Sequence, residues 1–268
     1  MFDYNKRTYI MGILNVTPDS FSDGGKFNSI DEALRHALEM VEEGADIIDL
    51  GGESTRPGHI YVDVDYVDVD EELKRVIPVV KKLKEELDTP ISVDTYKAKV
   101  ADESLKLGAE MINDIWGLRK DKDMANVIAK HNAYVCIMHN QDGTEYDKDI
   151  IESIKEFLLE SVDIAIEAGI DKNKIVLDPG IGFGKTYEQN LEVLKRLGEL
   201  KTLGYPILLG TSRKSVIGNT LNLPPQERVE GTIATTVLGI RDGVDIVRVH
   251  DVEKNLRAAK MADAIYRV

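Results

Sequence analysis

Short runs of apolar and β-branched residues alternate along the chain with longer segments in which apolar residues recur every three or four positions. The short runs are typical of buried strands. They cover residues 8–15, 45–51, 90–95, 110–115, 133–139, 174–180, 205–210 and 245–250. The longer segments predict amphipathic helices, most clearly at residues 29–44, 71–87 and 150–169. Several of them stop at a glycine, as helices often do: Gly44, Gly108, Gly169 and Gly243.

This alternation predicts the fold class. Strands that alternate with helices form parallel sheets covered by those helices. Eight strand–helix repeats with no linker rich in Pro, Gly or Ser favour an α/β protein built as one (β/α)8 TIM barrel, a single domain over residues 1–268. A doubly wound open sheet is the alternative that the pattern leaves open. The acidic near-repeat at residues 61–70 alternates like a strand, but its charge favours a surface excursion.

Composition narrows the class of partner. The 268 residues are 43% hydrophobic and 31% charged, as in folded globular proteins, and the formal net charge is −14. Such a negative field opposes binding to nucleic acid or to an anionic membrane, so we expect small-molecule partners. The one cysteine, Cys136, lies in an apolar run and is expected to be a buried hydrophobe. With neither a signal peptide nor a membrane span recognisable, the sequence predicts a cytoplasmic protein.

Polar residues recur where the predicted strands end. In parallel α/β folds these ends meet at one face, where ligands bind. One such residue alone could be a helix cap or a structural histidine, but the recurrence at nearly every strand predicts a site. The residues are Asn15, Asp94, Asn113, Asp114, His139, Asp178, Arg248 and His250, and the loops "GGESTRPG" and "GTSRKS" follow the second and seventh strands.

The residue types indicate what could bind there. Asp94, Asn113 and Asp178 offer acceptors that suit a flat heterocycle rich in N–H donors, such as a purine or a pterin. A second set carries cations and hydroxyls that suit a phosphate or carboxylate; it consists of Thr55, Arg56, Ser212, Arg213, Lys214, Ser215, Arg248 and His250. Asn15, near Asp19 and Asp23, could help to hold Mg²⁺, which prefers oxygen ligands. No spacing typical of a zinc site occurs.

The segment "IVLDPGIGFGKT" at residues 175–186 ends like a phosphate-binding P-loop. A P-loop needs a glycine five positions before its last glycine, and Pro179 stands there. The dinucleotide fingerprint GxGxxG is absent as well. We therefore expect Asp178, at the end of the strand, to be the functional residue of this segment, and we do not expect Lys185 to bind phosphate.

Seven motifs in order resemble the dihydropteroate synthase family along nearly the whole chain. They are "GILNVTPDSFSDGG", "GADIIDLGGESTRPG", "ISVDT", "INDIWG", "LDPGIGFGKT", "GTSRKS" and "RVHDV". The resemblance implies a (β/α)8 barrel, usually a homodimer that uses Mg²⁺. It implies condensation of 6-hydroxymethyl-7,8-dihydropterin diphosphate with p-aminobenzoate to give 7,8-dihydropteroate and diphosphate, a step of folate synthesis.

The resemblance also implies residue roles. The pterin would bind Asp94, Asn113, Asp178 and Lys214. The diphosphate would bind Thr55, Arg56, Arg248 and His250, and Asn15 through the metal. The p-aminobenzoate would bind Phe183, Lys214 and Ser215, and the catalytic residues would be Asp94, Asp178, Lys214 and Arg248.

Two other functions remain open. A barrel methyltransferase that binds methyltetrahydrofolate would share the pterin-facing acidic and amide residues, but it has no diphosphate to hold. A pterin-binding homologue without turnover is the other, although Asn15, Arg56, Lys214 and Arg248 are all present. The chain departs from the family pattern in the long acidic segment "HIYVDVDYVDVD" at residues 59–70 and in "MHNQDG" after the fifth strand.

Overall fold

Eight parallel strands form the centre of the protein. The computed structural model describes residues 2–4, 6–16, 26–53 and 67–267. The strands are β1 (Tyr9–Asn15), β2 (Ile47–Gly51), β3 (Ile91–Asp94), β4 (Met111–Asp114), β5 (Tyr134–Met138), β6 (Ile175–Asp178), β7 (Leu208–Leu209) and β8 (Ile246–Val249). They are ordered β6-β5-β4-β3-β2-β1-β8-β7, and a parallel bridge from Leu177 to Ile207 closes the sheet. The predicted barrel is confirmed, and the open sheet is excluded.

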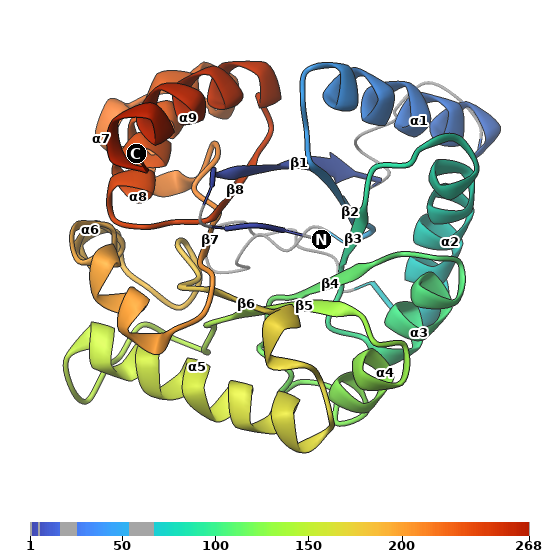
Figure 1. The fold of residues 1–268 in the computed structure, drawn as a ribbon, viewed down its shortest axis with the longest axis horizontal. Coiled ribbons are helices and arrows are strands. Elements are labelled where there is room, and N and C mark those ends of the chain that lie inside the picture. The colour runs from blue at the N-terminus through green and yellow to red at the C-terminus, as the bar shows by residue number, and fades with distance from the viewer. Residues whose placement is uncertain (1, 5, 17–25, 54–66, 268) are drawn as a thin grey trace.

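Helices surround this barrel (Figure 1). They are α1 (Lys26–Glu42), α2 (Val69–Glu86), α3 (Ala98–Lys106), α4 (Met124–Lys130), α5 (Ile150–Glu167), α6 (Tyr187–Lys195), α7 (Ser215–Leu221), α8 (Val229–Arg241) and α9 (Val252–Tyr266). The four glycines predicted to stop helices have φ between 93° and 100°. Side chains are rarely stable in that left-handed region, so glycine is the residue that ends a helix there. None of the helices in the described ranges is long and apolar enough to cross a membrane.

The seventh strand is shorter than predicted. The apolar run at residues 205–210 contains Pro206, which has no N–H to donate to a neighbouring strand. The next amide, that of Ile207, donates to the carboxylate of Asp245 at 2.9 Å. Regular pairing is therefore confined to Leu208 and Leu209.

The described part of the acidic stretch at residues 61–70 leads into a helix. Val67 is buried, and the Asp68 carboxylate accepts a bond from the Glu71 amide at the start of α2. Val69 and Asp70 form the first turn of that helix, where acidic residues oppose the positive end of the helix dipole. The acidic side chains Asp68 and Asp70 are exposed as predicted, but they stand at the start of α2 rather than in an excursion, and residues 61–66 lie outside the described part.

The barrel interior is apolar at the end where the strands begin. A cluster of inward-facing side chains fills it and includes Cys136, which is fully buried as predicted. The other members are Tyr9, Met11, Ile47, Met111, Val176, Leu208 and Ile246, with Phe2, Tyr4 and Tyr134 packed against them. Because successive residues of a strand face opposite sides, the residue two positions further along each strand also points inward, above this floor.

Candidate functional site

Polar side chains take over the barrel interior above the apolar floor. Asp94 and Asp178 end their strands, and Asn113 lies one residue before the end of β4; all three face inward and are buried. Asp94 pairs with Asn113 in the sheet register, and Arg248 pairs with Met11. Four of the predicted site residues therefore share one end of the barrel.

Arg248 is held between two carboxylates. Its Nε donates to Asp49 Oδ2 at 2.6 Å, and its Nη2 donates to Asp94 Oδ2 at 2.8 Å. The side-chain amide of Asn113 donates to the same oxygen of Asp49 at 3.1 Å. Asp49 is fully buried and was missed by the sequence analysis, which considered only strand ends. The signal was a charged residue inside the apolar run "ADIIDLG", on the same face as the apolar floor residue Ile47.

Two carboxylate oxygens in this network await a donor. Within the described part of the chain, Asp94 Oδ1 and Asp49 Oδ1 are buried and have no hydrogen-bond partner. Burial raises the pKa of Asp94 to about 7, against the opposing effect of Arg248. Buried acceptors without partners are costly, so a ligand with N–H donors would relieve a strain that the free protein carries.

Lys214 joins the acidic residues to the apolar wall. Its Nζ donates to the carbonyl of Ile181 at 2.6 Å and lies 4.8 Å from the centre of the Phe183 ring. A side chain added at Gly210 would place its Cβ 3.7 Å from Lys214 Nζ and 3.9 Å from Asp178 Oδ2. The absence of a side chain at Gly210 thus keeps a space open between lysine and carboxylate. Burial lowers the pKa of Lys214 to about 8, although Asp178 raises it.

Apolar side chains line the same end of the barrel. Phe183 packs with Ile115 and Met138, and Tyr96 and Trp116 lie against them. A site with charged acceptors on one side and an apolar wall on the other fits a polar heterocycle joined to an aromatic ring.

The loop after β7 carries the remaining predicted residues. Ser212 Oγ lies 2.9 Å from His250 Nδ1, so His250 is brought to this loop. Ser215 is the first residue of α7. Arg213 adopts φ of 59° and makes three bonds to the Asp251 carboxylate, so it stabilises the loop and does not enter the barrel interior. The guanidinium of Arg228 donates to the carbonyls of Arg213 and Lys214, which fixes the loop further.

Asn15 is the described residue that could hold Mg²⁺. It ends β1 with an exposed side chain, and its amide oxygen lies 3.7 Å from the point where a side chain of Gly51 would begin. Asp94 Oδ2 lies 3.8 Å from that same point. An exposed amide oxygen beside a carboxylate is compatible with Mg²⁺, although the described residues hold no cluster of three or more His, Cys, Asp or Glu that could bind a metal. Thr55 and Arg56 lie outside the described residues, as do Asp19 and Asp23.

Two polar residues at strand ends serve the scaffold instead. Asp114 follows the inward-facing Asn113, so it faces outward, where it accepts bonds from the amides of Trp116 and Leu118. His139 follows the inward-facing Met138 and packs edge-on against Phe157. Asp114 thus caps the turn at residues 115–118 rather than a helix, and the prediction of a structural histidine is confirmed for His139.

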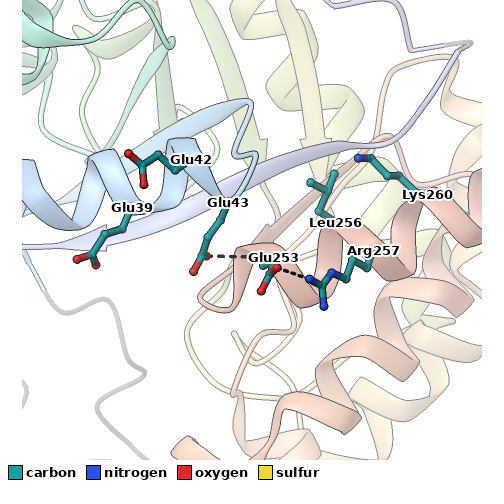
Figure 2. A pocket seen from close by; sticks show the side chains of 7 residues that line it. All are labelled: Glu39, Glu42, Glu43, Glu253, Leu256, Arg257 and Lys260. Atoms are coloured by element: carbon teal, nitrogen blue, oxygen red, sulfur yellow. Dashed lines mark hydrogen bonds and ion pairs between the residues drawn. The ribbon is translucent and has the colours of Figure 1, made fainter.

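A separate surface pocket lies between α1 and α9 (Figure 2). Its lining residues are Glu39, Glu42, Glu43, Glu253, Leu256, Arg257 and Lys260. These residues belong to the outer helices and include none of the polar residues inside the barrel. The pocket therefore plays no part in the candidate site.

Comparisons with known proteins agree with this geometry. The family model for pterin binding enzymes matches residues 11–250. The dihydropteroate synthase of Clostridium beijerinckii is 61% identical over 99% of this chain and 97% of its own length. A crystal structure of dihydropteroate synthase from Clostridium difficile, in the presence of pteroic acid, is 73% identical, covers 100% of both chains and has a TM-score of 0.97. The Xanthomonas albilineans enzyme with 4-aminobenzoic acid is 41% identical over 98% of this chain and 95% of that one, with a TM-score of 0.91. The chain therefore belongs to the dihydropteroate synthase family of pterin binding enzymes.

Proposed function

We propose that this protein condenses 6-hydroxymethyl-7,8-dihydropterin diphosphate with p-aminobenzoate, giving 7,8-dihydropteroate and diphosphate. One observation carries the proposal. The barrel brings buried acceptors (Asp94, Asp178), two cations (Lys214, Arg248) and an aromatic wall to one end. A pterin needs the acceptors, a departing diphosphate needs the cations, and an aromatic amine needs the wall.

The pterin would occupy the space beside Gly210. Asp178 would be the acceptor at its edge, because one carboxylate oxygen is held by the Gly180 amide at 2.7 Å while Oδ2 lies 3.9 Å from the point where a side chain of Gly210 would begin. Asp94 Oδ1, which has no hydrogen-bond partner, offers a second acceptor. Asn113 pairs with Asp94 in the sheet and lies between Asp94 and Asp178. Burial raises the pKa of Asp178, so N–H donors from the pterin would restore its ionised form.

The chemistry begins with departure of diphosphate. An ionised Asp178 that accepts bonds from the guanidine-like edge of the pterin raises electron density in the ring. This favours early cleavage of the C–O bond and leaves a cationic methylene on the pterin. The negative charge on the departing diphosphate would be stabilised by Arg248 and His250, and by Thr55 and Arg56 of the loop after β2. Mg²⁺ held at Asn15, when bound, would neutralise part of that charge.

The second half of the reaction is attack by the amine of p-aminobenzoate. That amine is neutral near pH 7, so its nitrogen attacks the methylene directly; the secondary ammonium formed is strongly acidic and releases its proton to water, so no strong general base is needed. Phe183 would pack on the ring, and Lys214 and Ser215 would bind the second substrate at the start of α7. The resulting enzyme transfers a pterinylmethyl group. We further propose that residues 1–268 act as a single domain and that the chain works as a homodimer with small-molecule substrates.

A single assay tests the function. Purified protein is mixed with pterin diphosphate and p-aminobenzoate, with and without Mg²⁺, and diphosphate release and dihydropteroate formation are followed together. Both products should appear in equal amounts and should depend on Mg²⁺. Binding of the pterin without turnover would instead identify a non-catalytic homologue. Methyl transfer from methyltetrahydrofolate, with no dihydropteroate formed, would identify the methyltransferase.

A further inference from the structure

Lys185 is a buried lysine whose hydrogen bonds all go to neutral groups. Its side chain is 4% exposed. Its Nζ lies 3.0 Å from each of three acceptors: the carbonyls of Gly180 and Phe183, and Nδ1 of His139. An ammonium group has three N–H donors, so these contacts use all of them. A charged ammonium group that is buried without an ion-pair partner costs free energy. We therefore infer that the arrangement of the acceptors held by Lys185 matters.

His139 is a suitable acceptor because it is neutral. Burial and, to a smaller extent, Lys185 together lower its pKa to about 2. When Lys185 is charged, its ammonium group can only donate, so Nδ1 of the neutral ring is the acceptor of this contact. Burial lowers the pKa of Lys185 itself to about 7, with a partly compensating effect of Asp178.

The turn that Lys185 holds carries three parts of the site. At its start, the Gly180 amide fixes one oxygen of Asp178. In its middle, the Ile181 carbonyl receives Lys214. At its end stands Phe183, whose ring lies beside Lys214. One buried ammonium group binds the carbonyl at each end of this four-residue turn.

We propose that Lys185 is a positioning residue for the second-substrate half of the site. By fixing the carbonyls of Gly180 and Phe183, it sets the direction of the Phe183 ring and of the Ile181 carbonyl that anchors Lys214. It touches neither substrate and acts through these two residues. The inference rests on the proposed function, because it takes Phe183 and Lys214 to be the p-aminobenzoate contacts.

Other bonds would keep the surrounding fold in place without Lys185. The next helix, α6, begins with its own capping box, in which Thr186 and Gln189 exchange side-chain to backbone bonds. Asn190 Oδ1 accepts from the Gly182 amide at 2.6 Å. Removal of the ammonium group should therefore loosen the turn locally while β6 and α6 remain.

The test compares Lys185→Met with a matched control. Methionine keeps the length and apolar stem of lysine but has no N–H. The control is Lys201→Met, which breaks a contact of 2.9 Å to the buried Asp245 at the opposite end of the barrel. Lys185→Gln is the intermediate variant, because its amide can still donate to one carbonyl. It replaces Lys185→Met in the comparison if Lys185→Met does not fold. KM for each substrate, kcat and the thermal midpoint are measured for all four proteins.

We expect Lys185→Met to raise KM for p-aminobenzoate about tenfold, which corresponds to about 1.4 kcal/mol, while KM for pterin diphosphate changes less than about threefold. Lys185→Gln should fall between Lys185→Met and the unmodified protein. In a double mutant with Phe183→Ala, the effects on KM for p-aminobenzoate should not add, since both act through Phe183. Equal changes for the two substrates, no change, or the pattern of Lys201→Met would overturn the proposal. An inactive unmodified protein would overturn the proposed function instead.

Discussion

Individual residues in the barrel matter chiefly through the charges around them. Arg248 lies between Asp49 and Asp94, so the three side chains together carry a single negative charge when all are ionised. The burial that raises the pKa of Asp94 makes that state costly in the free protein. A ligand that brings N–H donors is thus favoured over one that brings only negative charge to this part of the site.

Replacing Asp178 with asparagine should remove pterin-diphosphate binding and keep the fold. An amide oxygen can still accept the bond from the Gly180 amide, but it lacks the negative charge that strengthens bonds to the pterin. Two weakened charge-assisted bonds predict a loss of affinity of about 100-fold or more. Calorimetric titration with the pterin diphosphate measures it.

The thermal midpoint of Asp178→Asn serves as the control for that experiment. Because burial raises the pKa of Asp178, its ionised form is unfavourable in the folded protein. The asparagine variant should therefore unfold at the same temperature as the unmodified protein or at a higher one. Unchanged pterin binding would contradict the assignment of Asp178 to the pterin.

Lys185 should give the stability of the protein a measurable pH dependence. Burial lowers its pKa to about 7 in the folded protein, from 10.5 for an ordinary lysine. Between these values the unfolded chain binds more protons, so the free energy of unfolding rises with pH, by up to about 1.4 kcal/mol per pH unit. The advantage of the unmodified protein over Lys185→Met should grow from pH 7.5 to pH 9.5. Urea unfolding of both proteins at the two pH values measures this, and parallel curves would show that Lys185 does not titrate in this range.

Alternation along the strands explains which residues could be predicted. Residue type and strand end were enough to find Asp94, Asn113 and Asp178, and the structure places all three inward. The same criteria also selected Asp114, whose neighbour already occupies the inward face. They missed Asp49, which lies two residues before its strand ends. The apolar residues of each strand indicate which of its positions point into the barrel. Using that alternation would have excluded Asp114 and included Asp49.

At the scale of elements, two glycines beside the site should behave in opposite ways. Gly180, in the turn after β6, has φ of 69°, and a Cβ added there would meet the carbonyl oxygen of His139 at 1.9 Å. Gly180→Ala must move backbone and should lower the free energy of unfolding by about 2–4 kcal/mol. Denaturant unfolding measures this loss.

Gly210→Ala is the matched comparison at the end of β7. A Cβ there meets Lys214, Arg248 and Asp178 at ordinary contact distances of 3.7–3.9 Å. Stability should change by less than about 1 kcal/mol, because no backbone has to move. The methyl group would nevertheless occupy the space proposed for the pterin, so turnover should fall strongly in a folded protein. Full activity in Gly210→Ala would place the pterin elsewhere.

Most elements follow from local pattern, and the exceptions depend on contacts that no local pattern contains. The eight strands were predicted because buried parallel strands read as continuous apolar runs. The shortening of β7 depends on Asp245, which is distant in sequence and takes the amide of Ile207. The start of α2 at Val69 depends on the Asp68 cap within a stretch whose alternation resembles a strand.

For the whole molecule, the barrel determines which distant residues meet. Arg248 and Asp49 are 199 positions apart in sequence and are joined inside the closed sheet. The seven motifs in order indicated the family, and with it which distant residues share the site. The spacing of apolar residues gives no such information about distant residues. The order of helices along the chain does not show which of their outer faces stay exposed to solvent. Those faces decide where two copies of the chain could associate.

The proposed homodimer should form through the helices that follow β7. Exposed apolar side chains occur on α7, α8 and α9, which lie together in Figure 1: Leu221, Leu238, Met261, Ile265 and Tyr266. Exposed apolar side chains on neighbouring helices are typical of protein interfaces. Light scattering after size-exclusion chromatography should give twice the chain mass of 29.9 kDa. Leu238→Glu should reduce this to one chain, since a charge in such an interface lacks a partner. Leu159→Glu on α5 is the control, because Leu159 is 43% exposed against 48% for Leu238 and lies on another side of the barrel. A dimer that survives Leu238→Glu but not Leu159→Glu would place the interface on α5.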